Sequence, residues 1–468
     1  MSNEVSRTRN FGAKLYICLV GLALMFAVEV LGGISLGDYI HTMWIGLFAM
    51  ILPYEGILYI VSFLAPTCSL LPHFAHAFLV LLLILIIKKY VLLKHKTVGV
   101  AITLIILFTF WEIVAYAMYG VATINKVLGY ASAVAILFWI IYDKSVSDYK
   151  KHLKIFILGS FVLCALALLN TIINYSGSWI SDFLSGGMRL GGTANSEFNE
   201  TDVSLNANAL AYYSVTAIAC YLCSFDGAKK RGLGKFSELL VIAVVAFVGM
   251  LTVSRSWLLI TAVILLLFYF SRMRQSLFNA KNILAIFAMV ILVVWFVNSP
   301  FMEMFNARFE DDSADTAGGR TELFEQYFDI FFSNTRFMLF GTGVTNYTSV
   351  TQTATSMHNG AQQILVCLGL PMAIMFIIAL AVPIFKAKRQ KKIPLQYWLP
   401  AVAIIGFTQT IQFLNPNTYM VAYIMIVYAL KLSFSSADSF GHQIDIEKGE
   451  NDGNNKKSIE WNQKVNRW

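Results

Sequence analysis

The residues best suited to chemistry in this sequence are arginines that stand between long apolar runs. Arg255 lies in T-V-S-R-S-W (252–257), where two apolar runs meet with almost no polar loop between them. A charge at the centre of a membrane helix costs about 2.5–3.5 kcal/mol, so an arginine near such a boundary normally lines a polar cavity. Its planar guanidinium binds phosphate or carboxylate through two parallel hydrogen bonds and stays charged. The sequence therefore predicts an anion-binding site at Arg255.

The distribution of the basic residues supports this prediction. Most of the 35 Lys and Arg form blocks between apolar runs, and the positive-inside rule places such blocks on the cytoplasmic side. Loop carboxylates at 310–315 are the expected partners of two of the remaining arginines, Arg308 and Arg336, whereas Arg255 has no such explanation. Six basic residues lie in the expected external segments, and five of them are arginines: Lys126, Arg189, Arg255, Arg308, Arg320 and Arg336.

A histidine, His358, ends the longest external segment, in S-M-H-N-G (356–360). Imidazole is the side chain best suited to accept a proton near neutral pH. A lone histidine at this position is more often an interfacial cap, so a catalytic role depends on the arginines converging there. The other histidines are expected at the cytoplasmic surface or at the membrane interface: His95, His152 and His442 in the first group, and His41, His73 and His76 in the second.

The acidic residues give weaker signals. The cluster E-D-D-S-A-D (310–315) has the composition of a metal site, but no second cluster accompanies it, and a solvated loop is the better interpretation. Glu29, Glu55 and Glu112 lie inside apolar runs, where carboxylates serve as proton relays or polar contacts. The stretch 320–332 has aromatic and acidic residues at helical spacing, which predicts an amphipathic helix either on the outer interface or packed on the bundle.

The elements that must position these residues are membrane-spanning helices. Of the 468 residues, 57% are hydrophobic and 13% charged, whereas soluble domains carry about 25% charged residues. This composition excludes a soluble enzyme and a disordered protein. The net charge of +8 reflects membrane orientation rather than a nucleic-acid partner. Apolar runs of about 17–25 residues recur along the chain, which is typical of an all-α, polytopic transmembrane bundle and not of a β-barrel.

The runs and charges also predict the topology. The basic N-terminal segment and the block at Lys88 must share a side, so residues 13–87 hold an even number of spans. Pro53 and Glu55 interrupt the run at 40–66, which forms either two short spans or a re-entrant piece. We expect about 12 spans, with 14 as the alternative, and both termini in the cytoplasm. Later runs lie at about 97–120, 126–142, 154–174, 206–224, 236–253, 256–271, 282–298, 360–385, 395–413 and 417–433.

The predicted domain organisation is simple. One integral membrane domain covers 1–434, and it contains 299–359 as a large external loop. The polar, Asn- and Lys-rich segment 435–468 is expected to be a disordered cytoplasmic tail. No internal repeat is visible, which weakens the case for a transporter built from inverted halves.

Four motifs, spread in order over roughly 185–370, resemble those of the O-antigen ligase and bacterial polysaccharide polymerase superfamily. The N-terminal half resembles that family only in hydropathy, and Ala207 stands where the family often has proline. The motifs are M-R-L-G-G-T (188–193) followed by N-A-N-A-L-A (206–211), T-V-S-R-S-W (252–257), G-G-R (318–320) followed by G-T-G-V-T-N-Y (341–347), and M-H-N-G-A-Q-Q-I-L-V-C-L-G-L (357–370).

The resemblance implies a membrane glycosyltransferase of GT-C-like, all-helical fold in the bacterial cytoplasmic membrane, with its active site outside. Its donor would be a glycan on undecaprenyl pyrophosphate, and its acceptor a hydroxyl of another sugar, or of a lipid core in the ligases. Such enzymes are taken to be inverting and metal-independent, and no cofactor is expected. The implied partners are the lipid-linked glycan, the acceptor glycan, the bilayer, a flippase and a chain-length regulator.

The resemblance and the residue chemistry together predict individual roles. The arginines would stabilise negative charge that develops on the pyrophosphate leaving group. The histidine would orient or deprotonate the acceptor hydroxyl. Asn206 and Asn208 would hydrogen-bond sugar or hold the loop that carries Arg189, although a helix cap is an equally good interpretation of both. The predicted site consists of three catalytic residues, His358, Arg255 and Arg320, and four residues that bind pyrophosphate or glycan, Arg189, Asn206, Asn208 and Asn359.

Three functions are considered, of which the first is the predicted one and the other two are alternatives. The first is polymerisation of lipid-linked repeat units for capsule, exopolysaccharide or O-antigen. The second is ligation, in which finished glycan is transferred once to a terminal acceptor, and the shared motifs do not separate it from polymerisation. The third is a flippase for a lipid-linked glycan. A flippase needs charged residues spread through its spans, whereas here the candidates cluster in the expected external segments.

Overall fold

The computed structural model describes most of the chain. The described residues are 2–32, 38–67, 74–92, 99–120, 124–174, 179–184, 189–191, 206–225, 233–273, 284, 287, 291, 294, 297–299, 302–303, 306, 320–345, 347–353, 357, 359–390, 393–411, 413–414 and 419–433.

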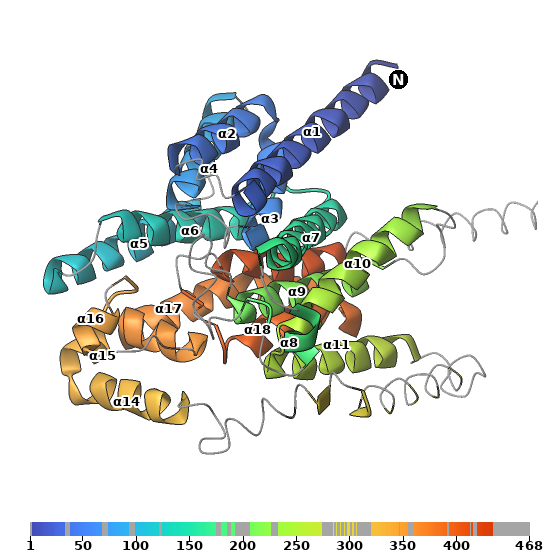
Figure 1. The fold of residues 1–468 in the computed structure, drawn as a ribbon. Helices are drawn as coiled ribbons and strands as arrows, with labels where there is room; N and C mark the ends of the chain where they lie inside the picture. The colour runs from blue at the N-terminus through green and yellow to red at the C-terminus, as the bar shows by residue number, and fades with distance from the viewer. Residues whose placement is uncertain are drawn as a thin grey trace, which may run out of the picture.

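Every regular element in this described part of the chain is helical, which confirms the expected all-α class (Figure 1). Six of its helices are long and apolar enough to cross a membrane: Phe11–Gly32, Gly99–Tyr119, Ile124–Tyr142, Tyr149–Ile173, Arg255–Arg272 and Gly360–Lys386. Four shorter apolar helices accompany them: Tyr39–Ile51, Phe236–Leu251, Leu395–Phe407 and Tyr419–Ser433. The chain is therefore a multi-pass helical membrane protein, and the total of 12 or 14 spans stays a prediction.

The N-terminal region consists of α1 (Ser2–Gly32), α2 (Asp38–Ile51), α3 (Tyr54–Thr67) and α4 (Phe74–Ile87) with the π-helical turn η2 (Lys88–Leu92). The run at 40–66 is thus two helices, and the choice between two short spans and a re-entrant piece stays a prediction. Proline cannot donate a backbone hydrogen bond and disfavours helix at the preceding residue, so Pro53 ends one helix and starts the next. Its carbonyl accepts from Gly56 N and Ile57 N in the first turn of α3.

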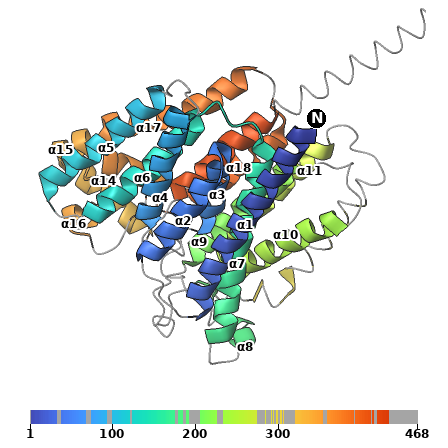
Figure 2. The ribbon, with the colours of Figure 1, turned by 90° about the horizontal axis from the view of Figure 1, so that it is seen from above.

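The central layer contains α5 (Gly99–Tyr119), α6 (Ile124–Tyr142) and α7 (Tyr149–Asn174), with the short α8 (Trp179–Leu184) beyond it. Helix α6 is buried along almost its whole length because α4 and α5 cover it. Helix α7 packs against α3, α9 and α10, and Figure 2 shows α1 running alongside it.

The second half of the molecule is built around α9 (Ala207–Ser224), which packs against α7, α10 (Leu233–Leu251), α11 (Arg255–Met273) and α18 (Leu399–Phe407). The one-turn helix η4 (Leu395–Trp398) precedes α18, and η5 (Tyr419–Tyr423) opens the C-terminal helix. Small residues let these helices approach closely, as is usual in membrane proteins. At Gly249 of α10 a β-carbon would collide with the side chains of Ser214 and Trp257.

The last group of helices is α14 (Arg320–Ser333), α15 (Thr335–Phe340), α16 (Tyr347–Thr351) and the long α17 (Gly360–Gln390). Figure 1 shows α14, α15 and α16 gathered beside α17, on the side where α5 also ends. The predicted amphipathic helix at 320–332 is confirmed as α14. It buries Tyr327 and Phe331 against the bundle while Phe332 stays 60% exposed, so packing on the bundle and an outward aromatic face occur together.

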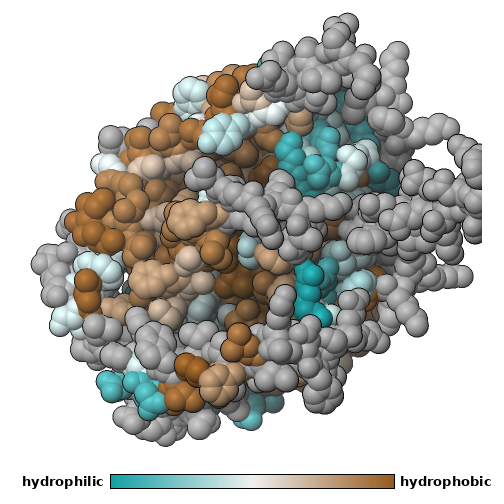
Figure 3. Space-filling view, turned by 90° about the vertical axis from the view of Figure 1, so that its right-hand side faces the viewer, coloured by the Kyte–Doolittle hydropathy of each residue, from teal (hydrophilic) through white to brown (hydrophobic). Residues whose placement is uncertain are grey.

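The surface has the character that a bilayer requires. Large apolar side chains are exposed on helices throughout the sequence, including α1, α5, α11 and α17. Figure 3 shows that hydrophobic residues dominate one broad part of the face it presents, with hydrophilic residues toward one side. Because a soluble monomer rarely exposes such a large apolar patch, this surface is consistent with contact with lipid.

One expectation about the surface is wrong. His152 was expected to be a cytoplasmic surface residue, but it is completely buried in the first turn of α7. Its ring lies 4.2 Å from that of Tyr59 and 4.5 Å from that of Tyr428, and its Nδ1 is 2.9 Å from Ser62 Oγ. The neighbouring lysines suggested exposure, but the first turn of α7 is enclosed by α3 and the C-terminal helix. His95 and His442 lie outside the described residues.

Candidate active site

The junction between α10 and α11 is a tight, buried turn. Thr252 N donates to Gly249 O over 3.3 Å, and Val253 N donates to Met250 O over 3.1 Å. Val253 has φ of +48°, which a β-branched residue adopts only under constraint. The next residues are Ser254, which is 6% exposed, and Arg255, which is the first residue of α11 and is half-buried. The turn therefore places Arg255, the residue predicted to bind an anion, at a helix start inside the bundle.

A short segment around Leu190 lies between this turn and the start of α9. Leu190 N donates to Leu251 O over 3.0 Å, and Gly191 O accepts from Ala207 N over 2.6 Å. Gly191 has φ of +73°, and a β-carbon there would meet Ala207 N at 2.9 Å, so only glycine fits this close approach. The half-buried Arg189 is thereby held next to the end of α10 and the start of α9.

The start of α9 is capped by one of the predicted sugar-binding residues. Asn206 Oδ1 accepts from Asn208 N over 2.8 Å, and the Asn206 side chain is exposed. This is the helix-cap interpretation left open by the sequence. It occupies the side-chain oxygen of Asn206, and it involves Asn208 through its backbone. The side chain of Asn208 is half-buried at the same helix end.

The start of α17 is fixed in a similar way by Asn359. Its Oδ1 accepts from Ala361 N over 3.0 Å and from Gln362 N over 3.1 Å. Its Nδ2 donates to Gln409 Oε1 over 2.9 Å, and Gly360 N donates to Thr408 O over 2.5 Å. The beginning of α17 is therefore attached to the residues that follow α18.

The residues around the end of α18 connect the start of α17 to the first turns of α9 and α11. The ring of Phe407 meets that of Tyr212 on α9 edge-on, with centroids 5.7 Å apart. At Gly406 a β-carbon would lie 2.9 Å from Ile260 Cδ1 on α11. Since Tyr212 and Ile260 each lie within two turns of the start of their helix, the end of α18 contacts all three helices near the predicted residues.

The structure thus relates most of the predicted site residues through direct contacts between the elements that carry them. Arg189, Arg255, Asn206, Asn208 and Asn359 lie at or beside helix starts in one connected group. Arg320 is the first residue of α14, and α14 is bonded to α17 through Gln362 Nε2, which donates to Phe324 O over 2.6 Å. The side chain of Arg320 and the whole of His358 lie outside the described residues.

The intramembrane carboxylate Glu112 is the clearest feature that sequence reasoning noticed without finding its role. It is 1% exposed, and its carboxylate accepts from Val344 N over 2.9 Å and from Thr345 N over 3.0 Å. Thr345 Oγ1 donates to it as well, over 2.6 Å. Of the two interpretations that the sequence left open, the structure therefore shows a polar contact, and the contact partner is the loop of the third motif.

The other two intramembrane carboxylates also have partners. Glu29 Oε2 lies 2.5 Å from His41 Nε2, and both side chains are buried. His41, expected at the interface, is therefore enclosed between α1 and α2. Glu55 accepts from Tyr59 Oη over 3.1 Å and from Ser147 Oγ over 3.2 Å. Glu55 and Tyr59 are four residues apart on α3, whereas sequence spacing gives no sign of the pairing of Glu29 with His41 or of Glu55 with Ser147, whose members come from different elements.

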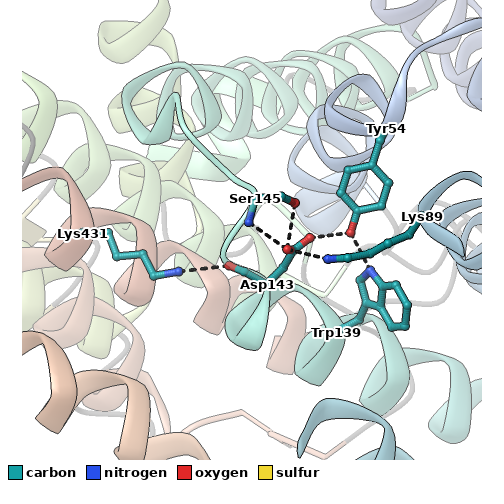
Figure 4. A network of polar contacts seen from close by, with 6 residues as sticks. All are labelled: Tyr54, Lys89, Trp139, Asp143, Ser145 and Lys431. Atoms are coloured by element: carbon teal, nitrogen blue, oxygen red, sulfur yellow. Dashed lines mark hydrogen bonds and ion pairs between the residues drawn. The ribbon is translucent and has the colours of Figure 1, made fainter. Parts of the chain in front are cut away.

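A second buried polar cluster surrounds Asp143 at the end of α6 (Figure 4). Asp143 is 1% exposed and forms an ion pair with Lys89 over 2.7 Å. It also accepts from Tyr54 Oη and from Ser145. Burial by itself raises the pKa of this carboxyl, but the hydrogen bonds from Lys89, Tyr54 and Ser145 outweigh burial and lower it below its usual value. This cluster joins three helices, and none of its members was a predicted site residue.

Among the described residues no group of three or more His, Cys, Asp or Glu could hold a metal ion. The acidic cluster at 310–315 lies outside the described residues, so its interpretation as a solvated loop stays a prediction.

Comparison with models of known protein families gives a match. Residues 239–377 match the family model described as O-antigen ligase. This confirms the resemblance inferred from the motifs, and the matched stretch contains Arg255, Arg320, His358 and Asn359. No curated protein and no solved structure matches the chain.

Proposed function

We propose that this chain, in which residues 239–377 form an O-antigen ligase-like segment, polymerises lipid-linked oligosaccharide repeat units. The reaction is transfer of a glycan from undecaprenyl pyrophosphate to a sugar hydroxyl, at the outer face of the bacterial cytoplasmic membrane. The observation that carries this proposal is the connected group of helix starts that brings Arg189, Arg255 and Asn359 onto neighbouring elements. The coarser function, an O-antigen ligase or polymerase type of enzyme in cell-surface polysaccharide biosynthesis, follows from the family match.

The proposed mechanism uses positive charge in place of a general acid. As the bond from the anomeric carbon to the pyrophosphate oxygen breaks, negative charge develops on the leaving group. Arg189, Arg255 and Arg320 stabilise this charge, and their guanidinium groups donate hydrogen bonds worth about 1.5–3 kcal/mol each. His358 accepts the proton of the attacking hydroxyl. A single direct displacement inverts the configuration at the anomeric carbon.

The surroundings described above suit this chemistry. Arg255 and Arg189 are half-buried, and partial exclusion of water strengthens their interaction with an anion. The start of α9 and the start of α11 each carry the positive end of a helix dipole, which favours negative charge there. The exposed apolar faces of the bundle provide a lateral approach for a polyprenyl chain from the bilayer.

Reconstitution of the purified protein tests the proposal. Proteoliposomes are supplied with the lipid-linked glycan that accumulates in cells lacking the gene. The wild type is expected to release free undecaprenyl pyrophosphate and to produce glycans of several repeat units. His358→Ala is expected to lower the rate by about 100-fold or more, while His95→Ala, at a predicted cytoplasmic position, retains it.

Other outcomes would overturn the proposal in different ways. Movement of the lipid-linked glycan across the membrane without release of undecaprenyl pyrophosphate identifies a flippase. Normal turnover by His358→Ala removes the histidine from the mechanism.

The second candidate is ligation, because the matched family model is described as O-antigen ligase. A ligase transfers finished glycan once to a terminal acceptor. The two functions differ in the species that accumulates when the gene is deleted. A single repeat unit on lipid indicates a polymerase, and long unligated polymer on lipid indicates a ligase.

A further inference from the structure

One face of α5 holds a loop that belongs to a distant part of the sequence. The loop is G-T-G-V-T (341–345), and Glu112 accepts three hydrogen bonds from its Val344 and Thr345. These bonds saturate both backbone N–H groups at the end of the loop. A carboxylate inside an apolar helix is costly unless it is fully hydrogen-bonded, and here the loop supplies the donors.

Other residues of the same helix face bind the same loop. Tyr119 Oη donates to Gly341 O over 3.0 Å, and a β-carbon at Gly343 would lie 3.0 Å from Ala115 Cβ. Trp111 Nε1 lies 3.0 Å from both Phe340 O and Leu368 O, so it joins the loop to α17. Positions 111, 112, 115 and 119 follow one another on one face of a helix.

The loop lies against a break in α17. Gly369 has φ of +72° and interrupts the helix, and Pro371 has no N–H to donate to Cys367 O. The loop provides the missing donors: Thr342 N bonds to Val366 O and Gly343 N to Cys367 O, both over 3.0 Å. Unpaired carbonyls within an apolar span cost several kcal/mol each, so the loop is what allows α17 to break at Gly369.

This arrangement holds the first part of α17 at both ends. The half-helix Gly360–Leu368 is attached at its start through Asn359, which bonds to Gln409. At its other end it is attached through the loop, and the loop is attached through Glu112. The position of Asn359 therefore depends on a carboxylate on α5, which lies outside the family match at 239–377.

We propose that Glu112 is a positioning residue for glycosyl transfer: its carboxylate fixes the 341–345 loop against the broken α17, and thereby fixes the half-helix that carries the site residue Asn359. Glu112 acts through backbone groups and does not touch the substrate. The inference rests on the proposed function, and it extends the working parts of the site to α5, in the half of the sequence that resembles the family only in hydropathy.

The test compares Glu112→Gln with the wild type in the proteoliposome assay. A glutamine has one acceptor oxygen, and its amide group opposes one of the two loop N–H groups, so the loop shifts. A displacement of about 1 Å far from the reacting atoms can cost about 100-fold in rate, so we expect kcat to fall 10- to 100-fold with little change in the KM for the lipid-linked glycan. The kcat of Glu112→Asp, which keeps the carboxylate, is expected to lie between that of the wild type and that of Glu112→Gln.

The matched control is Asp143→Asn, which makes the same carboxylate-to-amide change in the buried cluster of Figure 4. It leaves the Lys89 ammonium without its partner, so it should lower Tm at least as much as Glu112→Gln. Its kcat is expected to stay within about twofold of the wild type at temperatures where both are folded. If Glu112→Gln fails to fold, Thr345→Val removes one bond to the carboxylate and is expected to lower kcat several-fold.

Two results would overturn the inference. One is a kcat of Glu112→Gln, or of Thr345→Val where that variant replaces it, within twofold of the wild type. The other is an equal loss of kcat in Asp143→Asn, which would show that general destabilisation explains the effect. Failure of the wild type to release undecaprenyl pyrophosphate would instead contradict the proposed function and is seen before any variant is measured.

Discussion

At the scale of single residues, Arg255 is the predicted site residue whose surroundings the structure describes in most detail. Its sequence context predicts an arginine at the edge of an apolar run, and the structure shows it at the start of α11, half-buried, after a turn strained at Val253. A helix start is where an anion is favoured, and the guanidinium adds a full charge there.

Helix α11 allows a prediction about Arg255 with an internal control. Arg255→Ala should lower the rate of undecaprenyl pyrophosphate release by about 10- to 100-fold, because one charged hydrogen-bond donor contributes about 1.5–3 kcal/mol. Arg255→Lys keeps the charge without the planar fork and should recover only part of the rate.

The control is Arg272→Ala at the other end of the same helix, where the guanidinium donates to Phe225 O over 3.0 Å. Its rate is expected to match that of the wild type. An Arg255→Ala enzyme with unchanged rate would remove Arg255 from the site.

Several other residues show why spacing alone does not assign a role. Asn206 was equally well interpreted as a sugar ligand or a cap, and its Oδ1 is a cap. His152 looked like a surface residue because lysines surround it in sequence, yet it is buried between Tyr59 and Tyr428. In both cases the deciding contact depends on backbone geometry or on helices far away in the chain.

At the scale of elements, the break in α17 is the feature that the hydropathy of the sequence hides. The run at 360–385 reads as one uninterrupted span, but Gly369 divides it, and the 341–345 loop replaces the lost hydrogen bonds. Pro371 is the local signal for a break. The loop that supplies the missing donors lies earlier in the sequence. Thr342, whose N–H donates to Val366 O, is 24 residues before it. Only the folded chain therefore identifies this partner.

Substitution of Gly369 tests how much this break matters for stability. Gly369→Ala forces an L-residue into φ of +72° and places a β-carbon 2.7 Å from Gly341 N and Leu339 O. Such backbone strain costs about 1–3 kcal/mol, so Tm of the detergent-purified protein should fall clearly.

Gly99→Ala at the start of α5 is the matched control, since a β-carbon there meets nothing within 4 Å. Equal Tm values for Gly369→Ala and the wild type would mean that the loop and α17 separate easily, contrary to the structure.

At the scale of the whole molecule, two buried clusters hold together helices that are far apart in sequence. The Glu112 cluster joins α5 to the loop before α16, and the Asp143 cluster joins α3, the end of α4 and α6. Lys431 of the C-terminal helix donates to Asp143 O over 3.3 Å, so the last helix is also attached there (Figure 4). Of the six candidate spans, α5 and α6 thus take part in these polar clusters directly.

The Asp143 cluster gives a prediction about global stability. Lys89→Met leaves a buried carboxylate without its cation, and breaking a buried pair in this way costs about 3–5 kcal/mol. The double variant Lys89→Met/Asp143→Asn removes both charges and should regain part of that loss.

Unfolding of the purified proteins in detergent measures the difference. If the loss of stability in the double variant equals the sum of the losses in Lys89→Met and Asp143→Asn, then Lys89 and Asp143 are not energetically coupled.

The sequence by itself determined the class of the molecule, because the hydrophobic effect makes long apolar runs helices in a bilayer and the backbone leaves them no other spanning structure. The apolar runs also predicted the starts of α5, α6, α9, α10, α11 and α17 to within about three residues. The motifs identified the O-antigen ligase-like segment.

Only the tertiary structure decided which helix starts meet and what the intramembrane carboxylates do. Hydropathy is a property of single segments. Glu112 and Val344 are 232 residues apart in sequence, and only the packing of distant segments brings them together. A charge inside an apolar run shows that a partner must exist, since burial without one is too costly. The identity of that partner depends on the fold.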